Sequence, residues 1–322
     1  MTSVAIVTVN FRTGRLVGKS LEAVERERRR FGGEICIYVV DNNSGDDSVS
    51  FLSGFIESKG WGDWIYLRPH ATNAGFAAGN NIALREILSS PNAPDYIYFL
   101  NPDARTRPRA ISIMTEFLGT TPRVAIVGTR LEEPDGSLSR AAFRFPTAIS
   151  EFLRGAQVGA LDRLLHQWVV APAPQTVAHR TEWVSGASFM VRRQVFEKIG
   201  LLDEGYFLYF EEVDFMKSAA AHGLEVWYHP DARVVHDAGS STQIKDMRAK
   251  SGVLPLYWYD SLRRYFLKHH GRAGTLIAVA SWFAGRVVFS VAGLIRSRKH
   301  ESGGPDPRLL ITRVALPVLR GL

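Results

Sequence analysis

The sequence contains a single cysteine, Cys36, and no internal repeat or low-complexity linker in its 322 residues. One cysteine excludes an intramolecular disulfide and is typical of proteins from a reducing compartment. Cys36 lies within an apolar run, so we expect it to be a small core residue. The apolar run after Met1 is only as long as a strand and has no basic residues before it, so we expect no signal peptide.

The sequence also lacks a dinucleotide-binding fingerprint, a Walker loop and any recognised nucleic-acid-binding module. The formal net charge is nevertheless +7, with basic clusters at residues 26–30 and 245–272. Basic patches favour nucleic acid, anionic membranes or phosphorylated ligands. Because no nucleic-acid module accompanies the charge, we expect a phosphorylated ligand and a membrane surface, and no nucleic acid.

Short apolar runs alternate with amphipathic segments over the first hundred residues. Expected strands are 4–9, 34–40, 64–68 and 96–101, and expected helices are 14–30, 48–59 and a segment ending at residue 88. This alternation predicts an α/β fold with a mostly parallel, doubly wound sheet, whose strands carry polar residues at one shared edge. Later segments predict helices at 108–118, 150–178 in part, 193–199 and 213–222, strands at 124–128, 183–191, 225–229 and 234–236, and a hairpin at 130–145.

The run 96–100 predicts a buried central strand that ends in Asn101-Pro102-Asp103. Pro102 has no N–H and holds Asn101 extended, which leaves Asp103 at the carboxyl end, where open α/β sheets bind ligands. His236 follows a short strand and could join Asp103 on a divalent metal. The simpler interpretations are a strand-terminating turn and a structural histidine.

Two further polar stretches lie next to expected elements: Asp41 follows the strand 34–40, and the segment 73–81 leads into a helix. Asp41 could accept a hydrogen bond from a nucleobase or ribose, although Asp and Asn are equally common in turns. The segment 73–81 carries small residues that let backbone approach a ligand, and the helix after it offers free N–H groups to a diphosphate. A closely packed helix start is the alternative.

Glu211, Glu212 and Asp214 follow a run of apolar and aromatic residues at 206–210. Carboxylates in apolar surroundings can have a raised pKa and act as a base. The alternative is a helix N-terminus stabilised by acids through its dipole, and both interpretations can hold together.

The C-terminal part is basic and aromatic at 245–272 and then apolar at 275–295. The 21 apolar residues are just long enough to span a bilayer. Arg286 near their middle would cost roughly 2.5–3.5 kcal/mol on insertion. We therefore favour helices that lie on the membrane or pack on the protein over a true span, at the cytoplasmic, inner face of the plasma membrane.

Taken in order, these motifs resemble the family 2 glycosyltransferases of the GT-A fold, particularly their bacterial rhamnosyltransferase-like and galactofuranosyltransferase-like branch. The resemblance covers about residues 3–241. It implies a glycosyltransferase domain at 1–241 and a helical region at 242–322 that associates with membranes or binds the acceptor. The oligomeric state is left open.

The resemblance implies roles for individual residues. The nucleotide-diphosphate sugar would be bound by Asn10, Asp41, Asn43, Asn73, Gly75, Asn80, Asn101 and Asp103. The pocket for donor and acceptor would be shaped by Trp183, Gly186, Ala187 and Asp214. Asp103 and His236 would bind Mg²⁺ or Mn²⁺, and Glu212 or Glu211 would be the base. The sequence departs from the family pattern where Asn101 replaces the first acid of the metal motif, and where Glu-Glu replaces the usual Glu-Asp.

The implied reaction is metal-dependent, inverting transfer of a sugar from a nucleotide-diphosphate sugar, such as dTDP-rhamnose or a UDP-sugar. The acceptor would be a hydroxyl of a glycan or polyprenyl-linked molecule in cell-envelope polysaccharide synthesis. One alternative is a sugar-phosphate nucleotidyltransferase, which the absence of a glycine-rich loop with Arg and Lys after the first strand disfavours. The other is a non-enzymatic sugar-nucleotide-binding protein at the membrane.

Overall fold

The computed structural model describes residues 1–237, 254–296 and 304–321, so the basic segment 245–253 lies outside the described residues. The chain divides into two compact units. The first comprises Met1–Phe143, Ala173–Phe207 and Glu211–Thr242, and the second comprises Arg144–Pro172, Leu208–Phe210 and Gln243–Leu322. Arg144–Pro172 thus belongs to the same unit as the C-terminal region. The domains expected from the sequence, 1–241 and 242–322, place this segment in the first domain instead.

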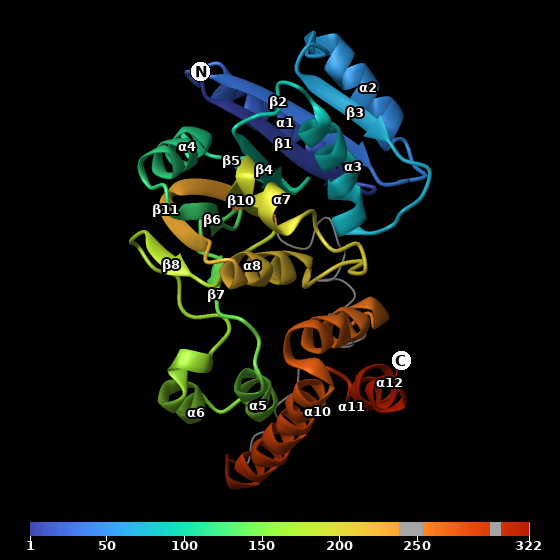
Figure 1. Ribbon diagram of the computed structural model, residues 1–322, viewed down its shortest axis with the longest axis vertical. Coiled ribbons are helices and arrows are strands. Elements are labelled where there is room, and N and C mark those ends of the chain that lie inside the picture. The colour runs from blue at the N-terminus through green and yellow to red at the C-terminus, as the bar shows by residue number, and fades with distance from the viewer. Residues whose placement is uncertain (238–253, 297–303, 322) are drawn as a thin grey trace. The chain divides into compact units, whose positions relative to one another are not determined.

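The first unit is built on a nine-stranded sheet within the described residues (Figure 1). Its strands, in sheet order, are β3 (Ile65–Pro69), β2 (Glu34–Asp41), β1 (Ser3–Asn10), β4 (Tyr96–Leu100), β10 (Ser188–Arg192), β6 (Val124–Glu132), β11 (Glu225–His236) and β5 (Ala104–Thr106), with β8 (His179–Thr181) also paired to β11. The first four are parallel to one another, whereas β10 is antiparallel to both of its neighbours. A separate pair joins β7 (Ala142–Phe143) to β9 (Trp183–Val184). The predicted mostly parallel sheet with flanking helices is confirmed.

The helices of the first unit follow the predicted order. They are α1 (Gly14–Arg28), α2 (Ser48–Lys59), α3 (Phe76–Ser89), α4 (Ala110–Thr120), α7 (Arg193–Ile199) and α8 (Glu211–Ala221). Helix α8 begins two residues earlier than expected, which places Glu211 and Glu212 inside its first turn. Strand β11 is continuous where two short strands were predicted. Its pairing with β6 is irregular between His229 and Arg233, because Pro230 in this stretch has no N–H to donate.

The centre of the sheet is apolar on both faces. All five residues of β4 are buried, and Phe99 of β4 stacks on Phe189 of β10 at 4.5 Å between ring centroids. Strand β2 instead alternates, with Ile35 and Ile37 buried and Cys36 only half-buried. The expectation that Cys36 is a core residue was therefore wrong, because its side chain lies on the less covered face of β2.

The second unit is helical. Its elements are α5 (Ala148–Ala156), α6 (Gly159–Leu164), the 3₁₀ turn η1 (His166–Trp168), α10 (Leu256–Arg296), α11 (Pro307–Leu309), the π-helical segment η2 (Leu310–Ala315) and α12 (Leu316–Arg320). Helix α10 is interrupted at Gly271, where φ is 66° and ψ is −175°. The helical prediction for 150–178 holds as far as Trp168.

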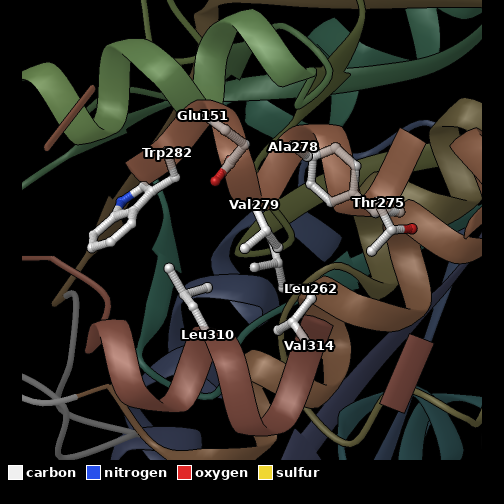
Figure 2. Close-up of a pocket in the computed structure, with 9 residues that line it drawn as sticks. Glu151, Leu262, Thr275, Ala278, Val279, Trp282, Leu310 and Val314 are labelled. Carbon is white, nitrogen blue, oxygen red and sulfur yellow. The ribbon is translucent and has the colours of Figure 1, made fainter. Parts of the chain in front are cut away.

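Helices α5 and α10 approach closely at Gly155 and Gly285. A Cβ atom on Gly155 would lie 2.3 Å from the carbonyl oxygen of Trp282, and one on Gly285 would lie 2.2 Å from that of Phe152. Only glycine allows this approach of two backbones. A small cavity near this contact is lined mainly by apolar side chains of α10 and η2, together with the carboxyl group of Glu151 (Figure 2). Burial raises the pKa of Glu151, although the neighbouring Arg154 counteracts that rise.

We predict that Gly285→Ala destabilises the protein by roughly 1–3 kcal/mol, the usual cost of overpacking. The reason is the backbone oxygen that the new methyl group would meet. Gly293→Ala is the matched control in the same helix, since nothing lies within 4 Å of a Cβ there. It should be neutral or stabilising by about 0.5–1 kcal/mol, because alanine favours helix. Thermal unfolding of both variants checks this, and equal melting temperatures would contradict the close contact.

Candidate functional site

The carboxyl ends of β1 and β2 meet in a buried polar network. Asn10 Nδ2 donates to Asp41 Oδ1 at 2.6 Å, and the Ser44 backbone N–H donates to Asp41 Oδ2 at 3.1 Å. Asp41 is only 2% exposed. Asn43 is exposed and has a left-handed backbone with φ of 58°. The structure thus brings Asn10 and Asp41 together and fixes the loop that carries Asn43.

The next loop is held by Asn42, a residue that sequence analysis did not select. Its Nδ2 donates to Asn73 Oδ1 at 2.9 Å and to the Gly75 carbonyl at 3.0 Å. Asn73 also accepts from the Gly75 N–H at 3.0 Å. Asparagine is common in the turn that follows a strand, so nothing in the sequence distinguished Asn42 from an ordinary turn residue.

Gly75 is required by a contact within the protein. Its φ is 94°, and a Cβ atom there would lie 2.2 Å from the carbonyl oxygen of Phe207. The same oxygen accepts from the Phe76 N–H at 2.7 Å. Asn80 is 1% exposed and donates to the Phe76 carbonyl at 2.8 Å. One of the α3 N–H groups expected to meet a diphosphate is therefore bonded inside the protein, and close packing explains Gly75.

Asp103 and His236 lie side by side, as the sequence predicted for two residues that follow strands. Antiparallel pairing of β5 with β11 sets His236 opposite Ala104. His236 Nε2 is 3.3 Å from Asp103 Oδ1, and Asp103 is 3% exposed. The Asp237 N–H donates to the Asp103 carbonyl at 3.2 Å, which holds the two segments together.

Asp103, His236 and Asn101 fit a divalent cation whose remaining ligands come from a substrate. In the described residues no group of three or more His, Cys, Asp or Glu side chains could hold a metal. Asp103 and His236 supply one carboxylate and one imidazole, and Asn101 Oδ1 is buried without a hydrogen-bond partner among the described residues. Mg²⁺ and Mn²⁺ accept such ligands and commonly complete their coordination with phosphate oxygens.

The acidic pair lies next to the loop between β9 and β10. Glu211 is 4% exposed, and burial, together with the neighbouring Glu212, holds its pKa well above the usual range. Burial raises the pKa of Glu212 as well, while a hydrogen bond with the Gly186 backbone counteracts the rise. A Cβ atom on Gly186 would lie 3.4 Å from Glu212 Oε1. Position 186 therefore faces the Glu212 carboxyl group, at an ordinary van der Waals distance.

The same loop is bonded to the end of β4. The Asn101 N–H donates to the Ala187 carbonyl at 2.9 Å. Ala187 is buried and follows Gly186 directly. One hydrogen bond and the covalent link between Gly186 and Ala187 thus connect the acidic pair with the Asn101–Asp103 segment. That the base and the metal ligands form one site stays a prediction.

Two other predicted pocket residues make contacts within the protein. Asp214 is 3% exposed and accepts a hydrogen bond from the Tyr206 hydroxyl at 3.3 Å. Trp183 is half-buried and stacks on Phe143 with ring centroids 4.2 Å apart. Their interactions support the walls of the site, while contact with a ligand stays a prediction.

The backbone just before the acidic pair is strained. Tyr209 and Phe210 both have φ of 69°, in the left-handed region that bulky residues rarely adopt. Each such residue costs on the order of 1–3 kcal/mol and is found mostly at functional sites. The aromatic run at 206–210 is visible in the sequence, but no residue type in it indicates this conformation.

The chain is similar to known glycosyltransferases in sequence and in fold. The family model described as Glycosyl transferase family 2 matches residues 3–200. N-acetylglucosaminyl-diphospho-decaprenol L-rhamnosyltransferase of Mycobacterium tuberculosis is 28% identical over 194 residues, which are 55% of this chain and 60% of that protein. Low-salt glycan biosynthesis hexosyltransferase Agl10 of Haloferax volcanii is 24% identical over 226 residues, 70% of this chain and 64% of that protein. The matches span about three fifths of these relatives' own length.

Among solved structures, the mannosyltransferase PcManGT from Pyrobaculum calidifontis, in complex with GDP-Man and Mn²⁺, is similar with a TM-score of 0.55 and 13% identity. The alignment covers 92% of this chain and 81% of that one. At this identity the likeness supports the fold alone, and it confirms the GT-A architecture predicted from the motifs. Since the family match covers more than half of the 322 residues, the chain belongs to the family 2 glycosyltransferases.

Proposed function

We propose that the protein transfers a sugar, with inversion, from a nucleotide-diphosphate sugar to a hydroxyl group of a lipid-linked glycan acceptor. The observation that carries this proposal is the connection of Glu212 through Gly186 and Ala187 to Asn101, two residues before Asp103. The names of the relatives support a rhamnosyl or hexosyl donor and, for the mycobacterial enzyme, a diphospho-decaprenol acceptor.

In the proposed reaction Glu212 takes the proton of the acceptor hydroxyl as its oxygen attacks the anomeric carbon. The bond from that carbon to the phosphate oxygen breaks, and the nucleoside diphosphate leaves with the electron pair. A single displacement of this kind inverts the anomeric configuration. Asp103 and His236 would hold a divalent cation, which when bound supplies positive charge for the leaving diphosphate.

Contacts and the larger rise in the pKa of Glu211 favour Glu212 over Glu211 as the base. Glu211 is 4% exposed, whereas Glu212 is half-buried and lies against Gly186. Two neighbouring carboxylates in a buried setting resist ionising together. Glu211, whose pKa is raised further by its neighbour, is the member of the pair that would keep its proton. Glu212 is then free to ionise and accept the proton of the acceptor.

We predict that Asp103→Asn removes the metal dependence of nucleotide binding and abolishes turnover while the fold survives. The amide keeps the volume of a side chain that is 3% exposed but removes its charge. Calorimetric titration with a nucleoside diphosphate, with and without Mn²⁺, measures the change. Asp47→Asn is the control, since Asp47 is exposed and pairs with Arg15. Unchanged Mn²⁺-dependent affinity in Asp103→Asn would rule out this cation site.

We predict that Glu212→Gln lowers the rate of acceptor-dependent nucleoside diphosphate release by roughly 10²–10⁴-fold, with donor affinity nearly unchanged. Glutamine keeps the volume but accepts no proton. Because burial raises the pKa of Glu212, the wild-type rate should rise with pH through that pKa as the carboxyl ionises. Glutamine at position 212 should remove this pH dependence.

Glu211→Gln is the matched control for the base. If Glu211 is the base, the two variants will exchange their behaviour. Near-normal rates in both, with donor saturating, would show that the pair is structural. Release of inorganic diphosphate in place of nucleoside diphosphate would favour the nucleotidyltransferase alternative.

Membrane association is supported by an apolar stripe on α10. The exposed positions Ile277, Ala280, Ala284, Val287 and Val291 fall within a narrow arc of the helix, by its period of 3.6 residues. The opposite side of the same helix packs on α5 through Gly285. In the described part of the chain, the helix at Leu256–Gly293 is long and apolar enough to cross a membrane. We propose that the stripe lies on the inner face of the plasma membrane, where a lipid-linked acceptor is reached.

We predict that replacing Ile277, Val287 and Val291 together by glutamine abolishes flotation of the protein with anionic vesicles. These side chains are 52–64% exposed, so the change should leave the melting temperature nearly unaffected. The control replaces Leu138 and Val177, which are 42% and 61% exposed in the first unit, by glutamine. Equal flotation of both variants and wild type would contradict a membrane role for the stripe.

A further inference from the structure

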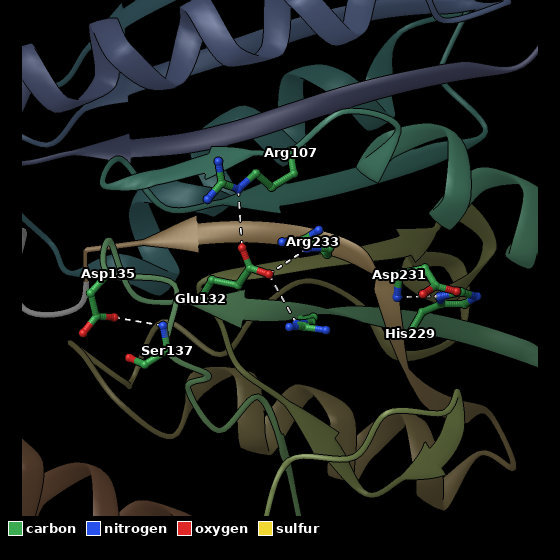
Figure 3. Close-up of polar contacts among 8 residues, drawn as sticks. Arg107, Glu132, Asp135, Ser137, His229, Asp231 and Arg233 are labelled. Atoms are coloured by element: carbon green, nitrogen blue, oxygen red, sulfur yellow. Dashed lines mark hydrogen bonds and ion pairs between the residues drawn. The ribbon is translucent and has the colours of Figure 1, made fainter.

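Three arginines, on β6, on β11 and directly after β5, surround one buried carboxylate of β6 (Figure 3). Glu132, whose side chain is 2% exposed, lies 2.7 Å from Arg233, 3.3 Å from Arg130 and 3.4 Å from Arg107. Strand pairing sets Arg233 beside Arg130, and the Arg107 N–H donates to the Arg233 carbonyl. The three arginines therefore form one row across neighbouring segments of the sheet.

The charge of this cluster is not balanced. Burial alone would raise the pKa of Glu132, but the hydrogen bonds and charges of the arginines outweigh it and hold the pKa below the usual range. Glu132 is therefore ionised at neutral pH. Three guanidinium groups against one carboxylate leave a net charge of two positive units in the cluster (3 − 1 = 2). Neutralising Glu132 alone requires fewer arginines.

The three arginines contact Glu132 in a way that leaves their Nη nitrogens available to another ligand. All three ion pairs with Glu132 run through Nε, so the paired Nη nitrogens make none of these contacts. The side chains are 30–49% exposed. Guanidinium groups presented through Nη nitrogens match the oxygens of a phosphate in bidentate fashion. Glu132 is thus a buried carboxylate whose ion pairs orient the three guanidinium groups.

The cluster is distinct from the candidate cation site. Side chains alternate along a strand, so His236 lies on the opposite face of β11 from Arg233. Arg130 and Glu132 share a face with Gly128, where a Cβ atom would lie 2.4 Å from the Val184 side chain. Val184 follows Trp183 in β9. The arginines therefore continue the sheet face that packs against β9, which carries Trp183 of the predicted donor and acceptor pocket.

We propose that Arg107, Arg130 and Arg233 bind a phosphate or diphosphate group, with Glu132 as their positioning residue. In the reaction proposed above this group is the diphosphate that a lipid-linked acceptor carries beside its sugar, so this identification rests on the proposed function. The binding of the anion itself does not. A phosphate headgroup of a membrane lipid offers the same chemistry and is the other source to be distinguished.

The first test titrates the full-length protein with inorganic diphosphate by calorimetry, without a divalent metal. Wild type should show saturable binding, and Arg107→Gln and Arg233→Gln should each weaken it by about tenfold or more, the usual effect of losing a charge-assisted hydrogen bond. Arg15→Gln is the matched control, because Arg15 is an exposed arginine paired with Asp47. Absence of saturable binding, or equal affinity in the control and the two variants, would overturn the site.

Glu132→Gln separates positioning from simple charge. This variant raises the net charge of the cluster by one unit, so attraction by charge alone would strengthen diphosphate binding. If Glu132 positions the guanidinium groups, binding weakens instead, and this is the result we expect. Stronger binding would overturn the role of Glu132. Melting temperatures accompany each titration, and the two exposed arginines carry the test if Glu132→Gln does not fold.

The second test distinguishes the two sources of the anion. The same acceptor sugar is presented on an alkyl diphosphate and on an uncharged alkyl chain. Arg107→Gln and Arg233→Gln should raise KM about tenfold for the diphosphate acceptor only, with flotation on anionic vesicles unchanged. Reduced flotation with unchanged KM would overturn the acceptor identification in favour of a lipid headgroup. Arginine-dependent diphosphate binding without any sugar transfer would support the anion site and refute the proposed function.

Discussion

The antiparallel pairing of β10 with β4 is the constraint on which the site depends. Ser188 lies opposite Leu100, and the pairing continues into the hydrogen bond from the Asn101 N–H to the Ala187 carbonyl at 2.9 Å. This bond sets the loop at Gly186 beside the carboxyl end of the central strand. Glu212 then lies against Gly186, 3.4 Å from where a Cβ atom at that position would lie. The Glu212 carboxyl group is thereby linked to the strand end that carries Asp103, although the two residues are more than 100 positions apart in the chain.

Local sequence patterns, such as helix boundaries and polar residues at strand ends, predicted much of this arrangement. Helices α2 and α7 have the predicted bounds, because a polar or glycine boundary marks each end. Asp103 and His236 were expected together since both follow strands, and they are 3.3 Å apart. The direction of β10 was not predictable, because an apolar run of five residues indicates burial but not whether its partner runs parallel. Long-range pairing, here between residues about 90 apart, decides that direction.

The segment that opens α3 shows why a glycine pattern alone is ambiguous. Gly75 has a positive φ and faces a neighbouring backbone, which are the same properties that a ligand-binding loop needs. The neighbour is the carbonyl of Phe207, about 130 residues later, and no local pattern could identify it. The same limit applies to Gly155 and Gly285, since neither glycine indicates in the sequence that α5 packs on α10 within the helical unit. A glycine signals that something approaches closely, but it does not reveal what approaches.

The acidic pair and the backbone before it argue that this region is shaped by its chemistry at the expense of stability. Glu211 and Glu212 are neighbouring carboxylates whose pKa values are raised by burial, so ionising both inside the folded protein is unfavourable. Tyr209 and Phe210 add left-handed backbone, each at a cost of about 1–3 kcal/mol. Glycine at 209 or 210 would relieve this strain, and amides at 211 and 212 would remove the repulsion between carboxylates. The chain has neither, although glycine stands where α5 meets α10 and where α3 begins. In the proposed reaction the rigid aromatic segment and the two carboxyl groups would serve the same purpose, since a base with a raised pKa is useful only if its position is fixed against the acceptor.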